Sequence, residues 1–195
     1  SGGWLPLAVA AGFLGTVAVW RRGRAVLRAR LQEQSRPLRP FLGELDPMLP
    51  RVPGTAVFLT GNPHVVPVAL ARNLRHYQAL HERVVVLTVR VRDLPLVPEA
   101  QRVTVERLGK GFYRVVVAYG FMDEPGVPRA LALCRAHGLP VDLERVSYFL
   151  SRETLVPSPR PDLNPVEERV FMLLSAGNLP ATAYFRLPPD QVVEL

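Results

Sequence analysis

The chain has 195 residues, a formal net charge of +7 and one cysteine, Cys134. This length is enough for one hydrophobic core of ordinary size plus an extension. A single cysteine excludes a disulfide within the chain and a metal site built from several cysteines, which suits a reducing, cytoplasmic setting. Because the chain begins with Ser1 and not with methionine, we expect it to be a piece of a longer protein.

The positive charge is concentrated in one short stretch. Residues 21–39 hold seven arginines and one acid, Glu33, which leaves a local charge of +6 and about +1 for the rest of the chain. A nucleic-acid-binding protein usually spreads its basic residues over a folded face. Here they follow directly on an apolar run, as in the cytoplasmic flank of a membrane span. We therefore expect no nucleic-acid partner.

The run from Trp4 to Trp20 contains no charged residue over 17 positions. As a helix it is roughly 25 Å long, against a hydrocarbon layer of ~30 Å. Arg21 and Arg22 can extend to the headgroups, and tryptophans suit both interfaces. A core helix of a soluble protein is the alternative, but Thr16 is the only polar residue, so no face is suited to water. The pattern predicts a membrane-spanning helix.

Small residues recur four apart in this helix, which favours close packing against other helices in lipid. The arginines then place everything after Arg21 in the cytoplasm. We divide the chain into a transmembrane helix, a basic juxtamembrane helix with a proline-rich linker, and a cytoplasmic α/β domain. These three parts cover residues 1–21, 22–54 and 55–195.

Residues 34–54 contain five prolines and two glycines. Proline fixes φ and removes a backbone donor, so we expect a semi-rigid linker of extended or turn conformation here.

Strand-like and helix-like patterns alternate beyond this linker. The predicted strands are Thr55–Thr60, Arg83–Val91, Arg102–Leu108, Phe112–Gly120 and Ser147–Ser151. The predicted helices are one with Val66, Leu70, Leu74 and Tyr77 on a buried face, one over Val127–His137, and one opened by Asn164 and Pro165. This order predicts an α/β fold with a mixed sheet of about five strands flanked by helices.

The glycines of Gly109-Lys110-Gly111 invite comparison with a phosphate-binding loop. Such a loop needs four residues between its first glycine and the Gly-Lys pair, and then Ser or Thr. Here Phe112 follows and a strand resumes. We interpret the tripeptide as the turn of a β-hairpin.

Side chains that could bind a metal or catalyse a reaction are scattered. No acid is spaced to complete a metal site with His64, His76, His81 or His137. Cys134 lies on an apolar helical face and is expected in the core.

The remaining polar candidates do not form a catalytic set either. Ser147 and Ser151 lack a nucleophile elbow. Arg152 and Glu153 suggest structural pairs, with a small-ligand contact as the alternative. Asp123 and Glu124 are expected to favour the N-terminal end of the next helix. We therefore predict no catalytic, cofactor-binding or metal-binding residue and no enzyme activity.

Several phrases, in the same order along nearly the whole chain, resemble the KUP/HAK/KT family of potassium uptake permeases. These phrases are GGWLPL (Gly2–Leu7), WRRGR (Trp20–Arg24), VPGTAVFLT (Val52–Thr60), LHERVVVLTV (Leu80–Val89), RVTVERLGKGFYRVVVAYGFMDEPGVP (Arg102–Pro128), SYFLSRE (Ser147–Glu153) and FRLPPDQVVEL (Phe185–Leu195). The chain departs from the family pattern near Val166, at Gly177–Leu179 and at Asp190.

The resemblance implies a C-terminal fragment of a proton-coupled potassium importer: its last membrane helix and its cytoplasmic domain. K⁺ and H⁺ would then be the ions transported by the full-length, multi-pass protein of the cell membrane. No acidic residue lies in the predicted span, so the ion pathway would belong to earlier helices. The expected partners are the lipid bilayer and those helices, with a homodimer and a small nucleotide regulator left open. The alternative is a membrane-anchored, nucleotide-binding signalling module.

Overall fold

The computed structural model describes residues 4–33, 36–151 and 181–195 of the chain, with side chains left out over residues 26–33. Two compact units are distinguished, and each is described by itself: α1 belongs to the first, and the elements from α2 to β6 belong to the second.

The first unit contains the long helix α1 (Trp4–Glu33). Its apolar part and its basic part form one continuous helix, and it contains no proline beyond the first turn. Pro6 lies in that first turn, where its missing N–H has no partner to lose.

The second unit is an α/β domain built on a six-stranded sheet of order β3-β4-β2-β1-β5-β6. All neighbouring strands are parallel except the β3–β4 hairpin. The α/β fold with a mixed sheet is therefore confirmed, with one strand more than expected. The strands are β1 (Arg51–Leu59), β2 (Leu80–Arg92), β3 (Val103–Gly109), β4 (Phe112–Gly120), β5 (Val146–Leu150) and β6 (Val192–Glu194).

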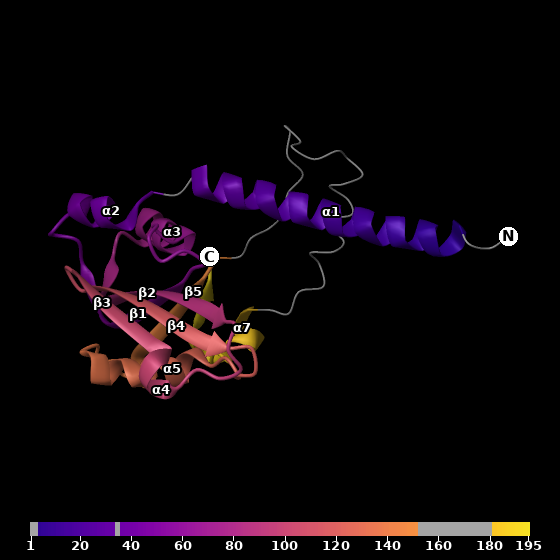
Figure 1. The fold of residues 1–195 in the computed structure, drawn as a ribbon. Helices are drawn as coiled ribbons and strands as arrows, with labels where there is room; N and C mark the ends of the chain where they lie inside the picture. Colours follow the sequence, from indigo (N-terminus) through magenta and orange to yellow (C-terminus); the bar gives the residue numbers. More distant parts are fainter. Residues whose placement is uncertain (1–3, 34–35, 152–180) are drawn as a thin grey trace. The chain divides into compact units, whose positions relative to one another are not determined.

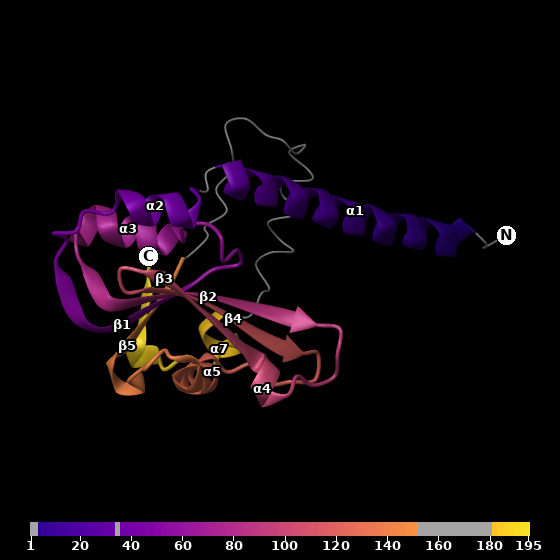
Figure 2. The ribbon, with the colours of Figure 1, turned by 60° about the vertical axis from the view of Figure 1, so that its left-hand side comes forward.

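Helices cover both faces of this sheet, as Figures 1 and 2 show. One face packs against α2 (Leu38–Glu44) and α3 (Val68–Tyr77), and the other against α5 (Val127–Leu133), which continues as the 3₁₀ turn η1 (Cys134–His137). The shorter elements are α4 (Glu99–Arg102), η2 (Leu143–Arg145), α7 (Ala181–Tyr184) and η3 (Pro189–Gln191).

Alternation along the strands supplies a separate core to each face. In β1, Ala56 and Phe58 belong to the core under α2 and α3, whereas Val57 between them belongs to the core over α5. A strand that is apolar on both faces is typical of the centre of a parallel sheet covered on both sides.

The linker prediction is wrong over Leu38–Glu44, which forms the helix α2. Pro37 and Pro40 lie at its start, where a missing N–H costs no hydrogen bond. Leu38 is 0% exposed and Leu42 is 6% exposed, so both belong to the core. Burial of one apolar stripe has stabilised a short helix that propensity alone does not predict.

Two further expectations need correction. Tyr77 does not belong to the buried face of its helix, because it lies in the last turn of α3 and is 64% exposed. Strand β6, which pairs with β5 through Tyr148 and Val192, was not predicted. The helix expected from Asn164 lies outside the described residues.

Candidate functional site

Helix α1 carries the part of the chain suited to a bilayer. Of the described helices it alone is long and apolar enough to cross a membrane, over the 22 residues Trp4–Ala25, and none of its most apolar stretch is buried. The one polar side chain within it is satisfied locally, because the Thr16 hydroxyl donates to the Gly12 carbonyl at 2.9 Å. No residue between Trp4 and Trp20 therefore presents an unpaired polar side chain to lipid.

Aromatic and basic side chains meet where the apolar stretch ends. The guanidinium of Arg24 lies 5.6 Å from the ring centre of Trp20. This arrangement suits an interfacial region, where the ring is amphipathic and the cation can reach water or a phosphate.

The Gly109-Lys110-Gly111 tripeptide is the turn between β3 and β4, as predicted. All three residues have positive φ, of 95°, 51° and 79°. The Lys110 ammonium donates to the Leu42 carbonyl at 2.8 Å and to the Leu45 carbonyl at 3.4 Å, at the C-terminal end of α2. The one lysine of the chain thus binds the negative end of a helix dipole.

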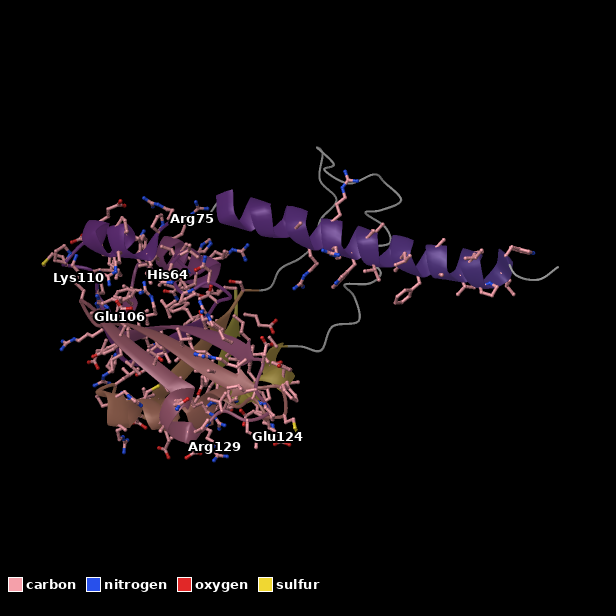
Figure 3. All side chains as sticks on the ribbon, viewed as in Figure 1. His64, Arg75, Glu106, Lys110, Glu124 and Arg129 are labelled. Carbon is pink, nitrogen blue, oxygen red and sulfur yellow. The ribbon has the colours of Figure 1, made fainter. Side chains whose placement is uncertain are left out.

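A chain of ion pairs beside this hairpin was not predicted from the sequence. The Glu106 carboxylate accepts hydrogen bonds from Arg39 and Arg114, both at 2.6 Å. Arg114 is only 8% exposed and also donates through Nε to the Pro63 carbonyl at 2.8 Å. Desolvation alone would raise the pKa of Glu106, but Arg114 and Arg39 together lower it below its ordinary value. In Figure 3, Glu106, Lys110 and His64 lie on the side of the sheet covered by α2 and α3.

Asp123 does not favour the start of the next helix as expected. Its Oδ2 accepts from the N–H groups of Gly120 at 2.7 Å and Val97 at 2.9 Å, and its Oδ1 accepts from Arg102 at 2.7 Å. These two backbone hydrogen bonds, and then Arg102, lower the pKa of Asp123. Three direct donors outweigh the weak pull of a helix dipole several residues away. Asp123 therefore ties the loop after β2 to the loop after β4.

Glu124 makes an exposed ion pair with Arg186 at 2.8 Å. Tyr119 lies nearby: its hydroxyl donates to the Gly126 carbonyl at 2.8 Å and accepts from the Gly126 N–H at 3.1 Å. Burial raises the pKa of Tyr119. These contacts fix the turn that leads into α5.

The histidines lie apart on different elements: the loop after β1, α3, β2 and η1. Within the described ranges, no three His, Cys, Asp or Glu side chains gather as metal ligands. Burial lowers the pKa of His81, whose ring lies edge-on to Phe149 at 6.0 Å. Burial also raises the pKa of the Cys134 thiol to about 12, so this cysteine is a core residue.

Ser151 has a structural contact. Its hydroxyl oxygen accepts the N–H of Ala69 in the first turn of α3 at 3.0 Å, while Ser147 lies within β5. Arg152 and Glu153 lie outside the described residues. In the part of the chain that the structure describes, the hydrogen bonds and ion pairs named above hold the fold together, and none of them joins a serine or cysteine to a histidine or a carboxylate.

Comparison with known proteins agrees with the resemblance noted in the sequence. Residues 53–195 match the family model of the K+ potassium transporter C-terminal domain. The whole chain is 46% identical to the probable potassium transport system protein Kup of Acidiphilium cryptum and 48% identical to that of Myxococcus xanthus. It is 47% identical to the probable potassium transport system protein Kup 1 of Paramagnetospirillum magneticum.

The chain spans 31%, 30% and 31% of the length of the Acidiphilium, Myxococcus and Paramagnetospirillum proteins, respectively. No solved structure is significantly similar to it. Because the family model matches residues 53–195 and the relatives match the whole chain, the chain belongs to the KUP/HAK/KT potassium transporter family, in which it corresponds to the C-terminal part.

Proposed function

We propose that this chain supplies the last membrane span and the cytoplasmic domain of a proton-coupled potassium importer. The observation that carries the proposal is the exposed apolar stretch of α1, which lies N-terminal to the domain that the potassium transporter family model matches. The relatives are named as potassium transport proteins and not as enzymes, and they are about three times as long as the chain.

The ion pathway belongs to other helices in this proposal. A coupled proton needs a titratable group at membrane depth, and potassium needs oxygen ligands there. The stretch Trp4–Trp20 has no acid, and its one hydroxyl is bonded to its own helix. The helix is therefore a packing element for earlier spans.

Orientation follows from the arginines after the span. Positive residues close to the end of a span favour the cytoplasmic side. Residues after Arg21, including the whole α/β domain, then lie in the cytoplasm.

The α/β domain has a structural or regulatory role, and two observations favour the structural one. In the glycine turn that could suggest a nucleotide site, the Lys110 ammonium donates to the Leu42 carbonyl of α2. Buried charges such as Arg114 are bonded within the domain. The alternative of a membrane-anchored nucleotide-binding module has no comparable support, and a nucleotide regulator stays a prediction.

Potassium flux tests the proposal. The full-length protein and a deletion of residues 36–195 are expressed in cells that lack other potassium uptake, and flux is normalised to the amount of protein in the membrane. The structural role predicts lower abundance of the deletion with unchanged flux per molecule, whereas a regulatory role predicts changed flux per molecule.

We expect the 195-residue chain reconstituted alone in liposomes to give no potassium flux above a lipid-only control. Flux from this fragment would contradict the assignment of the pathway to earlier helices.

A further inference from the structure

Five large apolar side chains are exposed where β2 and β4 of the α/β domain end. Val91 is the second-last residue of β2, and the other four lie on the two neighbouring loops that follow β2 and β4. Their exposed fractions lie between 52% and 67%. The five are Val91, Leu94, Leu96, Phe121 and Met122, and we call this surface the apolar loop pair. Exposed apolar residues that gather on one surface, and are not scattered singly, mark an interaction site.

The two loops are fixed to each other by the backbone. The N–H of Phe121 donates to the Leu94 carbonyl and the N–H of Met122 to the Pro95 carbonyl, both at 2.9 Å. The Asp123 carboxylate adds its bonds to Val97 and Gly120. The apolar side chains are therefore presented by a braced surface, which lowers the entropy lost when they are buried.

The apolar loop pair lies at the carboxyl edge of the sheet, where the parallel strands β2 and β4 end side by side (Figure 2). The chain enters the α/β domain at the same edge. The N–H of Leu38 donates to the His64 carbonyl at 2.8 Å, and that of Val66 donates to the Arg36 carbonyl at 2.9 Å, just beyond the end of β1. The first described residues of the α/β domain thus lie beyond the carboxyl end of β1, the strand next to β2.

Charge at this edge suits a lipid surface. Arg90 and Arg92 are exposed on β2, on the face of the strand opposite to Val91, and within the described ranges neither side chain has an ion pair or a hydrogen bond. Asp93 is one acid beside them, and the other, Glu124, is paired with Arg186. Exposed apolar side chains beside two arginines that have no partner among the described residues fit the boundary between acyl chains and anionic headgroups.

We propose that the apolar loop pair docks on the cytoplasmic surface of the bilayer, with Phe121 and Met122 entering the interface and Arg90 and Arg92 on the headgroups. A second copy of the domain would bury the same side chains. In a symmetric contact, however, the same patch of both copies would meet, and Arg90 and Arg92 would face the same arginines of the second copy. The inference rests on the proposed membrane span of α1.

Tryptophan fluorescence quenched by brominated lipid tests this docking in the full 195-residue chain. The chain is placed, one per disc, in nanodiscs of phosphatidylcholine and phosphatidylglycerol, with or without brominated acyl chains. One probe is Phe121→Trp in a background of Trp4→Phe and Trp20→Phe. The matched control in that background is Tyr77→Trp, because Tyr77 is also aromatic and also 64% exposed but lies at the far end of α3. A third chain, Trp4→Phe alone, reports on Trp20 in α1.

Docking predicts that brominated lipid quenches the Phe121→Trp probe and leaves the Tyr77→Trp control unchanged. Adding Arg90→Gln and Arg92→Gln reduces the quenching of the first probe. A quenched Trp20 with an unquenched Phe121→Trp probe overturns the docking and leaves the membrane span intact. An unquenched Trp20 overturns the span itself. Discs that hold two chains test the other occupant. If the emission of the Phe121→Trp probe shifts to the blue only in these discs and is not quenched by brominated lipid, a second copy covers the surface and the proposal is overturned.

Discussion

Gly120 ends β4 where the neighbouring loop leaves no room for a side chain. A Cβ at this position would lie 2.3 Å from the Pro95 carbonyl oxygen and 2.5 Å from that of Leu94. These are backbone atoms, which cannot move aside as a flexible side chain would. The close approach also brings the Gly120 N–H to the Asp123 carboxylate.

Replacing Gly120 by alanine is therefore expected to destabilise the α/β domain by about 1–3 kcal/mol, because the loop after β2 must shift away. The measurement is the thermal unfolding of the 195-residue chain in detergent. The control is Gly43→Ala in α2, where a Cβ would meet nothing within 4 Å. Alanine there should leave stability unchanged or raise it by up to about 1 kcal/mol. Equal effects at the two positions would contradict the close approach at Gly120.

Asp123 is expected to make the stability of the domain depend on pH. Its folded pKa is lowered, first by the N–H groups of Gly120 and Val97. A depressed carboxyl pKa contributes stability above the unfolded pKa of about 3.8, and that contribution is lost as the pH falls further, through the folded value. Glu106 shifts in the same direction through its two arginines, so part of the acid sensitivity remains without Asp123.

The Asp123→Asn variant should therefore melt at a lower temperature than the parent at pH 7, and the difference should shrink towards about pH 3. Asp93→Asn, an exposed change in the loop after β2, is the control and should melt like the parent at pH 7. If Asp123→Asn melts like the parent at every pH, the brace between the two loops does not stabilise the domain.

Helix α2 depends on contacts from elements far away in the chain. It has seven residues, which is too short to be stable alone in water. Its stability comes from the burial of Leu38 and Leu42 and from the Lys110 ammonium at its C-terminal carbonyls. The hairpin turn that carries Lys110 thus also fixes the entry of the chain into the sheet.

Lys110→Asn tests this link between elements. Asparagine tolerates the positive φ of 51° at this position but cannot reach the helix with a charge. We expect the free energy of unfolding to fall by roughly 1–2 kcal/mol and the backbone amides of residues 38–45 to exchange hydrogen faster. Arg107→Gln removes one positive charge from an exposed position of β3 and serves as the control. Unchanged exchange in α2 would show that Lys110 does not hold it.

At the scale of the whole molecule, the arginines after the span should decide orientation. The test changes Arg21, Arg22, Arg24 and Arg28 to glutamine in the 195-residue chain and follows digestion of the α/β domain by added protease in sealed vesicles. Fewer charges at the end of the span weaken the preference for the cytoplasmic side, so the population should become mixed. Lysine at the same four positions keeps the charge and should keep the orientation. A uniform population in the glutamine variant would contradict this role.

The sequence alone predicted the features that depend on neighbours along the chain. The span follows from 17 uncharged residues and the arginines after them, and the hairpin follows from two β-branched runs around Gly109-Lys110-Gly111. The alternation of strands and helices predicted the α/β class for the same reason, because periodicity is a local property. Register in the hairpin even sets Glu106 opposite Arg114, so that ion pair could have been found by counting from the turn.

Tertiary structure decided the features that depend on residues far apart. Helix α2 formed among prolines because its leucines reached the core, and β6 exists because β5 offered a free edge. Asp123 binds the N–H of Val97 on a neighbouring loop, and Lys110 binds the carbonyl of Leu42 in α2, 68 residues before it in the chain. The same pairing gathered Leu94 and Phe121 on one surface. Such contacts are selected by the free energy of the assembled fold, which no single window of sequence contains.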